Sequence, residues 1–169
     1  MKFIIGIDPG KNGGIAMLDQ DGKVINVEKM PETPQDLYDH LVALMAHAAS
    51  TASQMCEPDV VVYIEKVGGI PGQGASSAFS FGKGCGHLEM ALLALKLRTN
   101  DVTPQKWQKL YSVGHSSITK STAAEKKEHK LKLKAKCQSL FPSLGKKITN
   151  ATCDALLIAE YGRKQEVGK

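Results

Sequence analysis

A short apolar run near the N-terminus, Phe3-Ile-Ile-Gly-Ile, ends in the carboxylate of Asp8. The run alternates too little for a half-exposed strand, so it predicts a strand that is covered on both faces of a sheet. A second such run, DVVVYIEK at 59–66, carries an acid near its end, Glu65. Because strands buried on both faces need helices on either side, these two runs point to an α/β fold. A carboxylate at the end of such a strand is costly unless it is solvated, paired or bound to a cation.

The remaining elements complete a mixed sheet. The turn at 9–14 leads to a strand, IAMLD, and the turn at 19–22 leads to another, KVINVEK, which predicts three consecutive antiparallel strands. Further along, we expect a glycine-rich loop at 67–77, a short strand at 99–103, a linker at 112–122, and helices at 34–50, 76–98, 104–111, 123–140 and 150–163. This order predicts an RNase H-like α/β fold, in which three antiparallel strands are followed by parallel strands and helices cover both faces. Other mixed-sheet folds share the pattern.

The size and composition of the chain are those of one ordinary domain. Its 169 residues, 42% hydrophobic content and mean hydropathy of −0.20 predict a single soluble domain at 1–169. Neither a signal peptide nor a run of about 18 apolar residues is evident, so we expect no membrane partner. The four cysteines are scattered without a C-x-x-C pair, which argues against a zinc site and predicts a reducing, cytoplasmic location: Cys56, Cys85, Cys137 and Cys153.

Charge is distributed unevenly along the chain. Residues 1–99 carry eight Lys or Arg and eleven Asp or Glu, whereas residues 100–169 carry fourteen basic and six acidic residues. Nine lysines lie between Lys120 and Lys147, against only Glu125 and Glu128. Such a run can be a solvated helix face. It can also be a surface that contacts nucleic-acid phosphates, because clustered lysines displace counterions from DNA.

Three acids are candidates for one site. If the strands that end in Asp8 and Glu65 are parallel neighbours, both carboxylates emerge at one edge of the sheet. Asp154 lies in the first turn of an expected helix, NATCDALLIA. Three carboxylates brought together repel one another unless cations neutralise them, and their oxygens are the ligands that Mg²⁺ prefers. Two ions about 3.5–4 Å apart can activate water and stabilise the leaving oxygen of a phosphodiester. Alternatively, each acid makes only a local cap or surface pair.

Four separated blocks of the chain carry a resemblance to a known family. In order they are IGIDPGKNGGIA, VVVYIEKVGGIPGQGASSAFSFGKGCG, VTPQKWQKLY and CDALLIAEYGRK. Together they resemble the RuvC-type Holliday junction resolvases, most of all the bacteriophage members, over nearly the whole chain. The resemblance implies a homodimeric crossover junction endodeoxyribonuclease that nicks four-way DNA junctions symmetrically with two Mg²⁺ ions per site, Mn²⁺ being able to substitute. It further implies that Asp8 bridges both ions, that Glu65 is the second ligand and that Asp154 is the ligand from the last helix.

One position departs from the family pattern. The family commonly has a further acid three or four residues before the last aspartate, where this chain has Ala151 and Asn150. On a helix, Asn150 and Asp154 share a face, so Asn150 is the candidate fourth catalytic and metal-binding residue. An amide oxygen is a neutral and weaker ligand than a carboxylate. We therefore hypothesise that Asn150 weakens or inactivates the site, either as an introduced Asp-to-Asn change or naturally.

Candidate DNA contacts come from the loops and from the basic half of the chain. Glycines after Asp8 and in the 67–77 loop could let a DNA strand approach the backbone. Ile70, Phe79 or Phe81 could wedge between bases at the junction centre, although both phenylalanines could equally be core. Trp107 fits the core better than a stacking role. The predicted DNA-binding residues are Lys11, Gly72, Gln73, Ser76, Ser77, Phe79, Lys83, Lys106, Lys120, Lys126, Lys127 and Lys130.

The helix expected over 76–98 is the candidate dimer interface. Its segment GHLEMALLALKLR is apolar on more than one face, which predicts packing against both the core and a partner helix: Leu88, Met90, Leu92, Leu93 and Leu95. A symmetric dimer would bring two active sites to two opposed strands of a junction.

Other functions remain open at this stage. The glycine turn after Asp8 also resembles the phosphate loop of the actin-like and sugar-kinase ATPases, but those need a second domain and over twice this length. A non-catalytic protein that binds branched DNA is favoured by Asn150 alone. A nuclease that acts broadly on forks and flaps as well as on four-way junctions fits the same residues.

Overall fold

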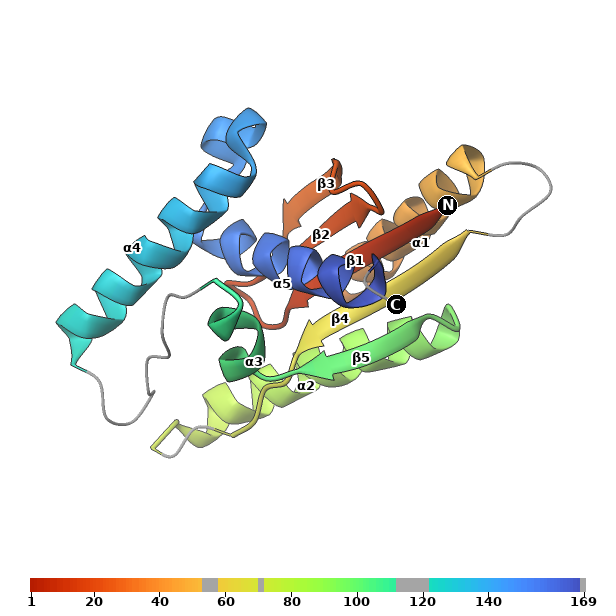
Figure 1. Cartoon of the computed structure of the whole chain (residues 1–169). Helices are drawn as coiled ribbons and strands as arrows, with labels where there is room; N and C mark the ends of the chain where they lie inside the picture. Colours follow the sequence, from red (N-terminus) through yellow and green to blue (C-terminus); the bar gives the residue numbers. More distant parts are fainter. Residues whose placement is uncertain (53–57, 70–71, 112–121, 168–169) are drawn as a thin grey trace.

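The structure is a computed structural model, and it describes residues 1–52, 58–69, 72–111 and 122–167 (Figure 1). Ile70, Lys120 and most of the linker expected at 112–122 lie outside these ranges. The strands are β1 (Lys2–Asp8), β2 (Gly14–Asp19), β3 (Val24–Lys29), β4 (Asp59–Glu65) and β5 (Arg98–Val102). The helices are α1 (Pro34–Thr51), α2 (Ala75–Ala94), α3 (Pro104–Lys109), α4 (Ala123–Leu140) and α5 (Asn150–Val167), with a 3₁₀ segment at Pro142–Lys147.

The five strands form one mixed sheet in the order β3-β2-β1-β4-β5. Strand β1 pairs antiparallel with β2, and β2 with β3, whereas β1 and β4, and β4 and β5, pair in parallel. The three-stranded antiparallel meander followed by parallel strands is the arrangement predicted from the sequence. Parallel pairing of β1 with β4 is the feature that matters for function, because it brings the ends of these two strands to the same edge.

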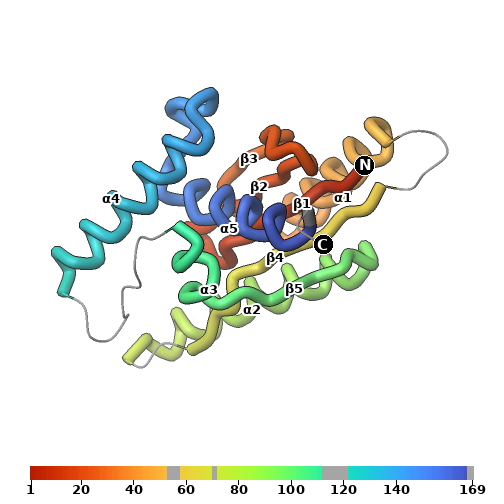
Figure 2. The backbone as a smooth tube through the Cα atoms, viewed as in Figure 1, coloured from red at the N-terminus to blue at the C-terminus, as the bar shows by residue number. Residues whose placement is uncertain are grey.

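Two hydrophobic cores lie on opposite faces of the sheet. One face packs against α1 and α2, and the other packs against α3, α4 and α5. Figure 2 shows α5 lying along the sheet in front, with α1 and α2 on the far side. The alternating side chains of β1 divide between the two cores, since Phe3, Ile5 and Ile7 face α1 and α2 while Ile4 faces α5. Helices therefore cover both faces, as predicted.

Helix α5 approaches β1 very closely, and a glycine makes this possible. A Cβ atom placed on Gly6 would lie 2.3 Å from the carbonyl oxygen of Ala155 and 2.3 Å from the amide nitrogen of Ala159. Any side chain at position 6 would therefore push α5 off the sheet. Because Asp154 is next to Ala155 in α5, this contact fixes the depth at which Asp154 meets the edge of the sheet.

Helix α2 ends earlier than the sequence predicts. The expected helix extends to residue 98, but α2 stops at Ala94 and β5 begins at Arg98. The chain leaves the helix through Lys96, whose φ is +54°, while Leu97 N–H donates to the carbonyl of Leu92 and Lys96 N–H donates to that of Leu93. These are the two bonds of a helix-terminating motif that usually has glycine at the left-handed position. With lysine there, the sequence lacks the usual stop signal.

Helix α5 continues to Val167, past its predicted end at 163, and a buried carboxylate holds its last turn. The side chain of Glu166 is only 3% exposed, and it accepts hydrogen bonds from Lys2 Nζ at 3.0 Å, Tyr63 OH at 2.9 Å and Arg98 at 3.0 Å. Burial alone would raise the pKa of Glu166, but these hydrogen bonds lower it to about 2. The cluster ties the end of α5 to β1, β4 and β5.

We expect Glu166→Gln to lower the free energy of unfolding at pH 7 by about 2–3 kcal/mol, because charge-assisted hydrogen bonds are lost. The melting temperature should fall by about 5–10 °C, as measured by circular dichroism. Since the folded pKa lies below the unfolded value, the deficit should be complete above about pH 4.5 and disappear as the pH falls towards 2. Asp59→Asn is the matched control, because Asp59 is 51% exposed and also pairs with Lys2. Equal losses in both variants would contradict this account.

Within the described ranges, no helix is both long enough and apolar enough to cross a bilayer.

Candidate active site

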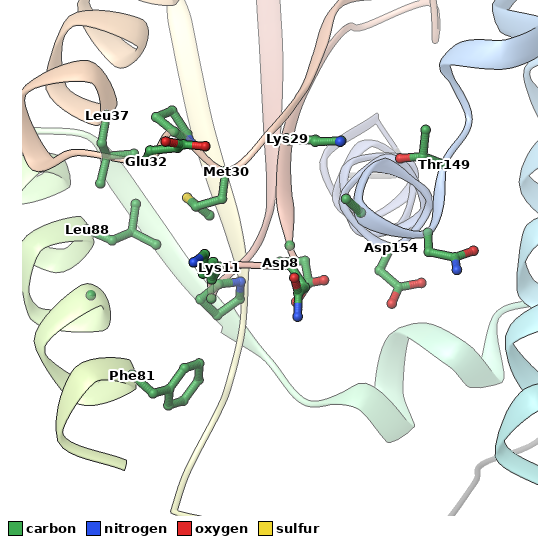
Figure 3. A pocket seen from close by; sticks show the side chains of 18 of the residues that line it. Asp8, Lys11, Lys29, Met30, Glu32, Leu37, Phe81, Leu88, Thr149 and Asp154 are labelled. Carbon is green, nitrogen blue, oxygen red and sulfur yellow. The ribbon is translucent and has the colours of Figure 1, made fainter. Parts of the chain in front are cut away.

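The carboxylates of Asp8 and Glu65 lie at the ends of two adjacent parallel strands. Ile7 of β1 is opposite Ile64 of β4, so the next residue of each strand is an acid at the same edge of the sheet. Asp154, near the start of α5, reaches this edge from the helix that crosses β1. Figure 3 shows the side chains of Asp8 and Asp154 directed into one space. The structure therefore brings together the three acids that the sequence singles out.

The three carboxylates are buried, and their pKa values are shifted upwards. Burial raises the pKa of Asp8 to about 8, and the nearby charges of Asp154 and Glu65 add to the shift. Burial also raises the pKa of Glu65 to about 7, with a further contribution from Asp154, although a hydrogen bond from Trp107 opposes it. The pKa of Asp154 is raised as well, chiefly by burial. Lys130 is the cation that partly offsets the charges of Asp8 and Asp154. The cluster is thus short of positive charge.

The donor set at this edge is made of hard oxygen ligands, which suit Mg²⁺. In the part of the chain that the structure describes, no three His, Cys, Asp or Glu side chains converge on one point as a closed metal cage would require. Mg²⁺ does not need such a cage, since it is usually held by one or two carboxylates together with water and substrate phosphates. The residues therefore fit a cation whose coordination is completed by water and substrate.

The glycine turn after Asp8 is packed against the protein itself. A Cβ atom on Gly13 would lie 2.0 Å from the carbonyl oxygen of Asp8, and one on Gly14 would lie 2.6 Å from that of Ala151. The expectation that these glycines leave room for a DNA strand is therefore wrong for Gly13 and Gly14. Their lack of a side chain instead lets the chain fold back on Asp8 and lets α5 begin close to it.

An open groove of about 2250 Å³ passes over the acidic edge, between α2 and α4 (Figure 3). Asp8, Asn150 and Asp154 line it, whereas Glu65 does not. Among the residues predicted to bind DNA, the groove lining includes Lys11, Gln73, Ser77 and Lys130. It also includes cations that the sequence did not distinguish from other surface lysines: Lys29, Lys134 and Lys146.

Several predicted DNA-binding residues lie outside the groove lining. Phe79 is 75% exposed on α2, so it is not a core residue. Lys120 falls outside the described residues. The others are exposed or half-buried at positions that do not line the groove: Gly72, Ser76, Lys83, Lys106, Lys126 and Lys127.

The second aromatic of α2 lies at the site. Phe81 is half-buried and lines the groove, and its ring edge would be 3.0 Å from a Cβ atom placed on Gly10, just beyond Asp8. Phe81 thus packs against the turn that follows β1. It is neither fully buried in the core nor fully exposed, so both roles that the sequence left open remain possible. Gln73 is also in the groove lining, and within the described part of the chain no donor reaches its buried Oε1.

Glu65 has a partner that sequence reasoning missed. The indole Nε1 of Trp107 donates a hydrogen bond to Glu65 Oε2 at 2.7 Å. Trp107 is fully buried, which confirms that it belongs to the core and does not stack on DNA. The signal available in the sequence was that Trp107 comes shortly after the short strand expected at 99–103. In the structure this strand, β5, lies beside β4, which ends in Glu65.

Asn150 and Asp154 lie one helical turn apart at the start of α5, and both line the groove. Thr149 precedes them and stabilises the helix start, since its hydroxyl accepts a hydrogen bond from the amide of Thr152 at 3.3 Å. Asn150 is exposed to the groove. An amide thus occupies the place at which the resemblance leads one to expect a fourth acid.

Comparison with solved structures identifies the fold class. The chain has an RNase H-like α/β fold, shared with RuvC Holliday junction resolvase structures over nearly its whole length. One is Thermus thermophilus RuvC in complex with a Holliday junction substrate, at 17% sequence identity and a TM-score of 0.59, covering 99% of this chain and 97% of that one. Another is Thermus thermophilus RuvC, at 15% identity and a TM-score of 0.58, covering 98% and 96%. No family model and no curated protein matches the sequence.

Proposed function

We propose that this protein is a metal-dependent endonuclease that resolves four-way DNA junctions. The observation that carries the proposal is the meeting of Asp8, Glu65 and Asp154 beside a lysine-lined groove. The fold supports it, because the chain matches RuvC structures from end to end, and one of those structures holds a Holliday junction. At this level of identity the likeness concerns the fold, so the activity remains the part to be tested.

The catalytic roles follow from position and charge. Asp8, Glu65 and Asp154 would hold Mg²⁺, with the amide of Asn150 as a weaker fourth ligand. Two bound Mg²⁺ ions would supply an activated water and stabilise the leaving oxygen. Asp8 would be the residue shared between the two ions, which is the role that the resemblance assigns to it. Lys130 lies near Asp8 and Asp154 and lines the groove, which suits it to hold the phosphate beside them.

DNA would lie along the groove between α2 and α4. Lys11, Lys29, Lys134 and Lys146 line it and can neutralise phosphates, and Gln73 and Ser77 are polar residues of the same lining. Helix α4 extends away from the sheet (Figure 1), and only Leu133 and Cys137 in it are buried. Its N-terminal half, with the exposed Lys127, could contact an arm of the junction.

The test is cleavage of an end-labelled four-way junction in Mg²⁺, with product mapping on each strand. Paired nicks at symmetric positions on two opposed strands support a resolvase. Fork and flap substrates, assayed at the same concentration, distinguish a resolvase from a nuclease that cuts branched DNA broadly.

A second candidate function is junction binding without cleavage. The specific observation in its favour is Asn150, a neutral residue in the groove beside three acids. Under this alternative the protein binds four-way junctions tightly and cuts none of them in any divalent metal.

We also propose that the protein is a homodimer assembled through α2. Leu88 and Leu92 of this helix are buried in the core, whereas Met90 is 59% and Leu93 69% exposed. Of the leucines and methionine predicted to contact a partner helix, Met90 and Leu93 are therefore the exposed ones. Phe79, which is 75% exposed, extends this apolar face towards the start of α2. A second copy would cover this apolar stripe by two-fold symmetry.

We expect Leu93→Lys to weaken the dimer by about 100-fold or more, since each buried leucine contributes about 1.5–3 kcal/mol and the substitution occurs in both copies. The lysine would also face its own symmetry-related charge. Light scattering coupled to size-exclusion chromatography over a concentration series measures the effect. Leu131→Lys on α4 is the control, because Leu131 is 59% exposed and lies on another helix. A monomer at all concentrations without any substitution would rule out the dimer.

A further inference from the structure

The hydrogen bond between Trp107 and Glu65 lies just behind the acidic edge, away from the groove. One oxygen of Glu65 is directed into the protein, where it meets the indole at 2.7 Å. An indole N–H can only donate a hydrogen bond, and an ionised carboxylate can only accept one, so the two groups are complementary. The indole occupies Oε2 of Glu65 and leaves Oε1 to bind a cation.

The fold places Trp107 there through strand pairing. Glu65 is opposite Val102 in the parallel β4–β5 pair, and Lys66 N–H extends the ladder by donating to the Val102 carbonyl at 2.8 Å. Pro104 then starts α3 directly after β5, so the first turn of that helix brings Trp107 back over the end of β4. Glu65 and the indole are thus held by one rigid connection.

Trp107 also connects Glu65 to the helix that carries Asp154. Its ring packs edge-on against Tyr111, at 6.3 Å between centroids, and the Tyr111 hydroxyl donates to the carbonyl of Leu157 in α5. Leu157 is three residues after Asp154. A continuous buried path therefore runs from the acid at the end of β4 to the acid on α5.

We propose that Trp107 is a positioning residue that fixes the carboxylate of Glu65 for a divalent cation. The inference rests on the proposed function, because it assumes that Glu65 is a metal ligand. Outer-shell partners of this kind typically change metal affinity or activity by about 10- to 100-fold when they are removed. A residue that only filled the core would leave metal affinity unchanged once the protein is folded.

Trp107 is the single tryptophan of the chain, so its fluorescence reports directly on this contact. We expect Mg²⁺ alone, without DNA, to change the emission of the unsubstituted protein in a saturable way. Glu65→Gln should abolish that change.

Isothermal titration with Mg²⁺ then compares Trp107→Phe, which keeps an aromatic ring but loses the donor, with Tyr111→Phe, which loses only the hydroxyl. We expect Mg²⁺ affinity to fall by about 10- to 100-fold in Trp107→Phe, and to stay within about threefold in Tyr111→Phe. If Trp107→Phe is folded and binds Mg²⁺ as tightly as the unsubstituted protein, the positioning role is wrong while the metal site stands. If the unsubstituted protein and Asn150→Asp both fail to bind Mg²⁺ on their own, the positioning role is wrong, and the proposed function falls with it only if neither protein cuts a four-way junction in Mg²⁺.

Discussion

Asp8→Asn is expected to reduce junction cleavage by about 10³-fold or more while leaving junction binding nearly unchanged. The loss follows because Asp8 would be a ligand shared by both metal ions, and the charge stabilisation that these ions supply amounts to several kcal/mol. Binding depends on lysines that the substitution does not touch. Single-turnover cleavage in Mg²⁺ measures the first effect, and gel-shift titration in Ca²⁺ measures the second.

The same substitution should stabilise the metal-free protein at alkaline pH. The folded pKa of Asp8 is about 8, above its ordinary value of 3.8, so the folded state holds the proton over this interval and loses stability as the pH rises through it. We expect equal melting temperatures for the two proteins near pH 4 and a higher one for Asp8→Asn near pH 8. Asp21→Asn, in an exposed turn, is the control for both measurements. Full cleavage by Asp8→Asn would remove Asp8 from the mechanism.

Asn150→Asp is expected to increase cleavage by about 10- to 100-fold, the reverse of the first effect. A carboxylate there would face the groove one turn before Asp154, so a charged oxygen would replace the neutral amide. The fourth negative charge adds repulsion in the metal-free state. Without Mg²⁺, the variant should therefore melt at a lower temperature than the unsubstituted protein. Adding Mg²⁺ should raise the melting temperature of the variant by more than that of the unsubstituted protein.

The matched control for this variant is Asn12→Asp, which makes the same change of charge at another exposed position in the groove lining. We expect no gain in cleavage from it. A similar gain in both variants would mean that charge in the groove matters and that position 150 has no ligand role. Equal or lower cleavage in Asn150→Asp alone would contradict the assignment of that position.

Much of the fold could be predicted because its signals are local. The apolar runs ending in Asp8 and Glu65 predicted buried strands, and the glycine turn after Asp8 predicted the antiparallel meander. The end of α2 could not be predicted, since Lys96 occupies the left-handed position where glycine would have signalled a stop. The last turn of α5 was missed because Glu166 acquires its partners only when three strands lie beside it.

Some residues of the candidate site could likewise be predicted from the sequence, and others could not. Asp8, Glu65 and Asp154 could be selected from the sequence, because an acid at the end of a buried run is visible without a structure. The Trp107 hydrogen bond joins residues 42 positions apart and depends on the register of β4 against β5. Which lysines line the groove depends on the direction of α4, so Lys130 and Lys134 could not be separated in advance from Lys126 and Lys127.

The most direct test of the central claim is cleavage of a labelled four-way junction by the Asn150→Asp variant, beside the unsubstituted chain, over a range of Mg²⁺ concentrations. The carboxylate site predicts symmetric nicks that require the metal, with the variant cutting faster than the unsubstituted chain at every concentration. If both proteins bind the junction tightly and neither cuts it in Mg²⁺ or Mn²⁺, then the protein binds junctions without catalysis and the acids at the sheet edge do not form a nuclease site.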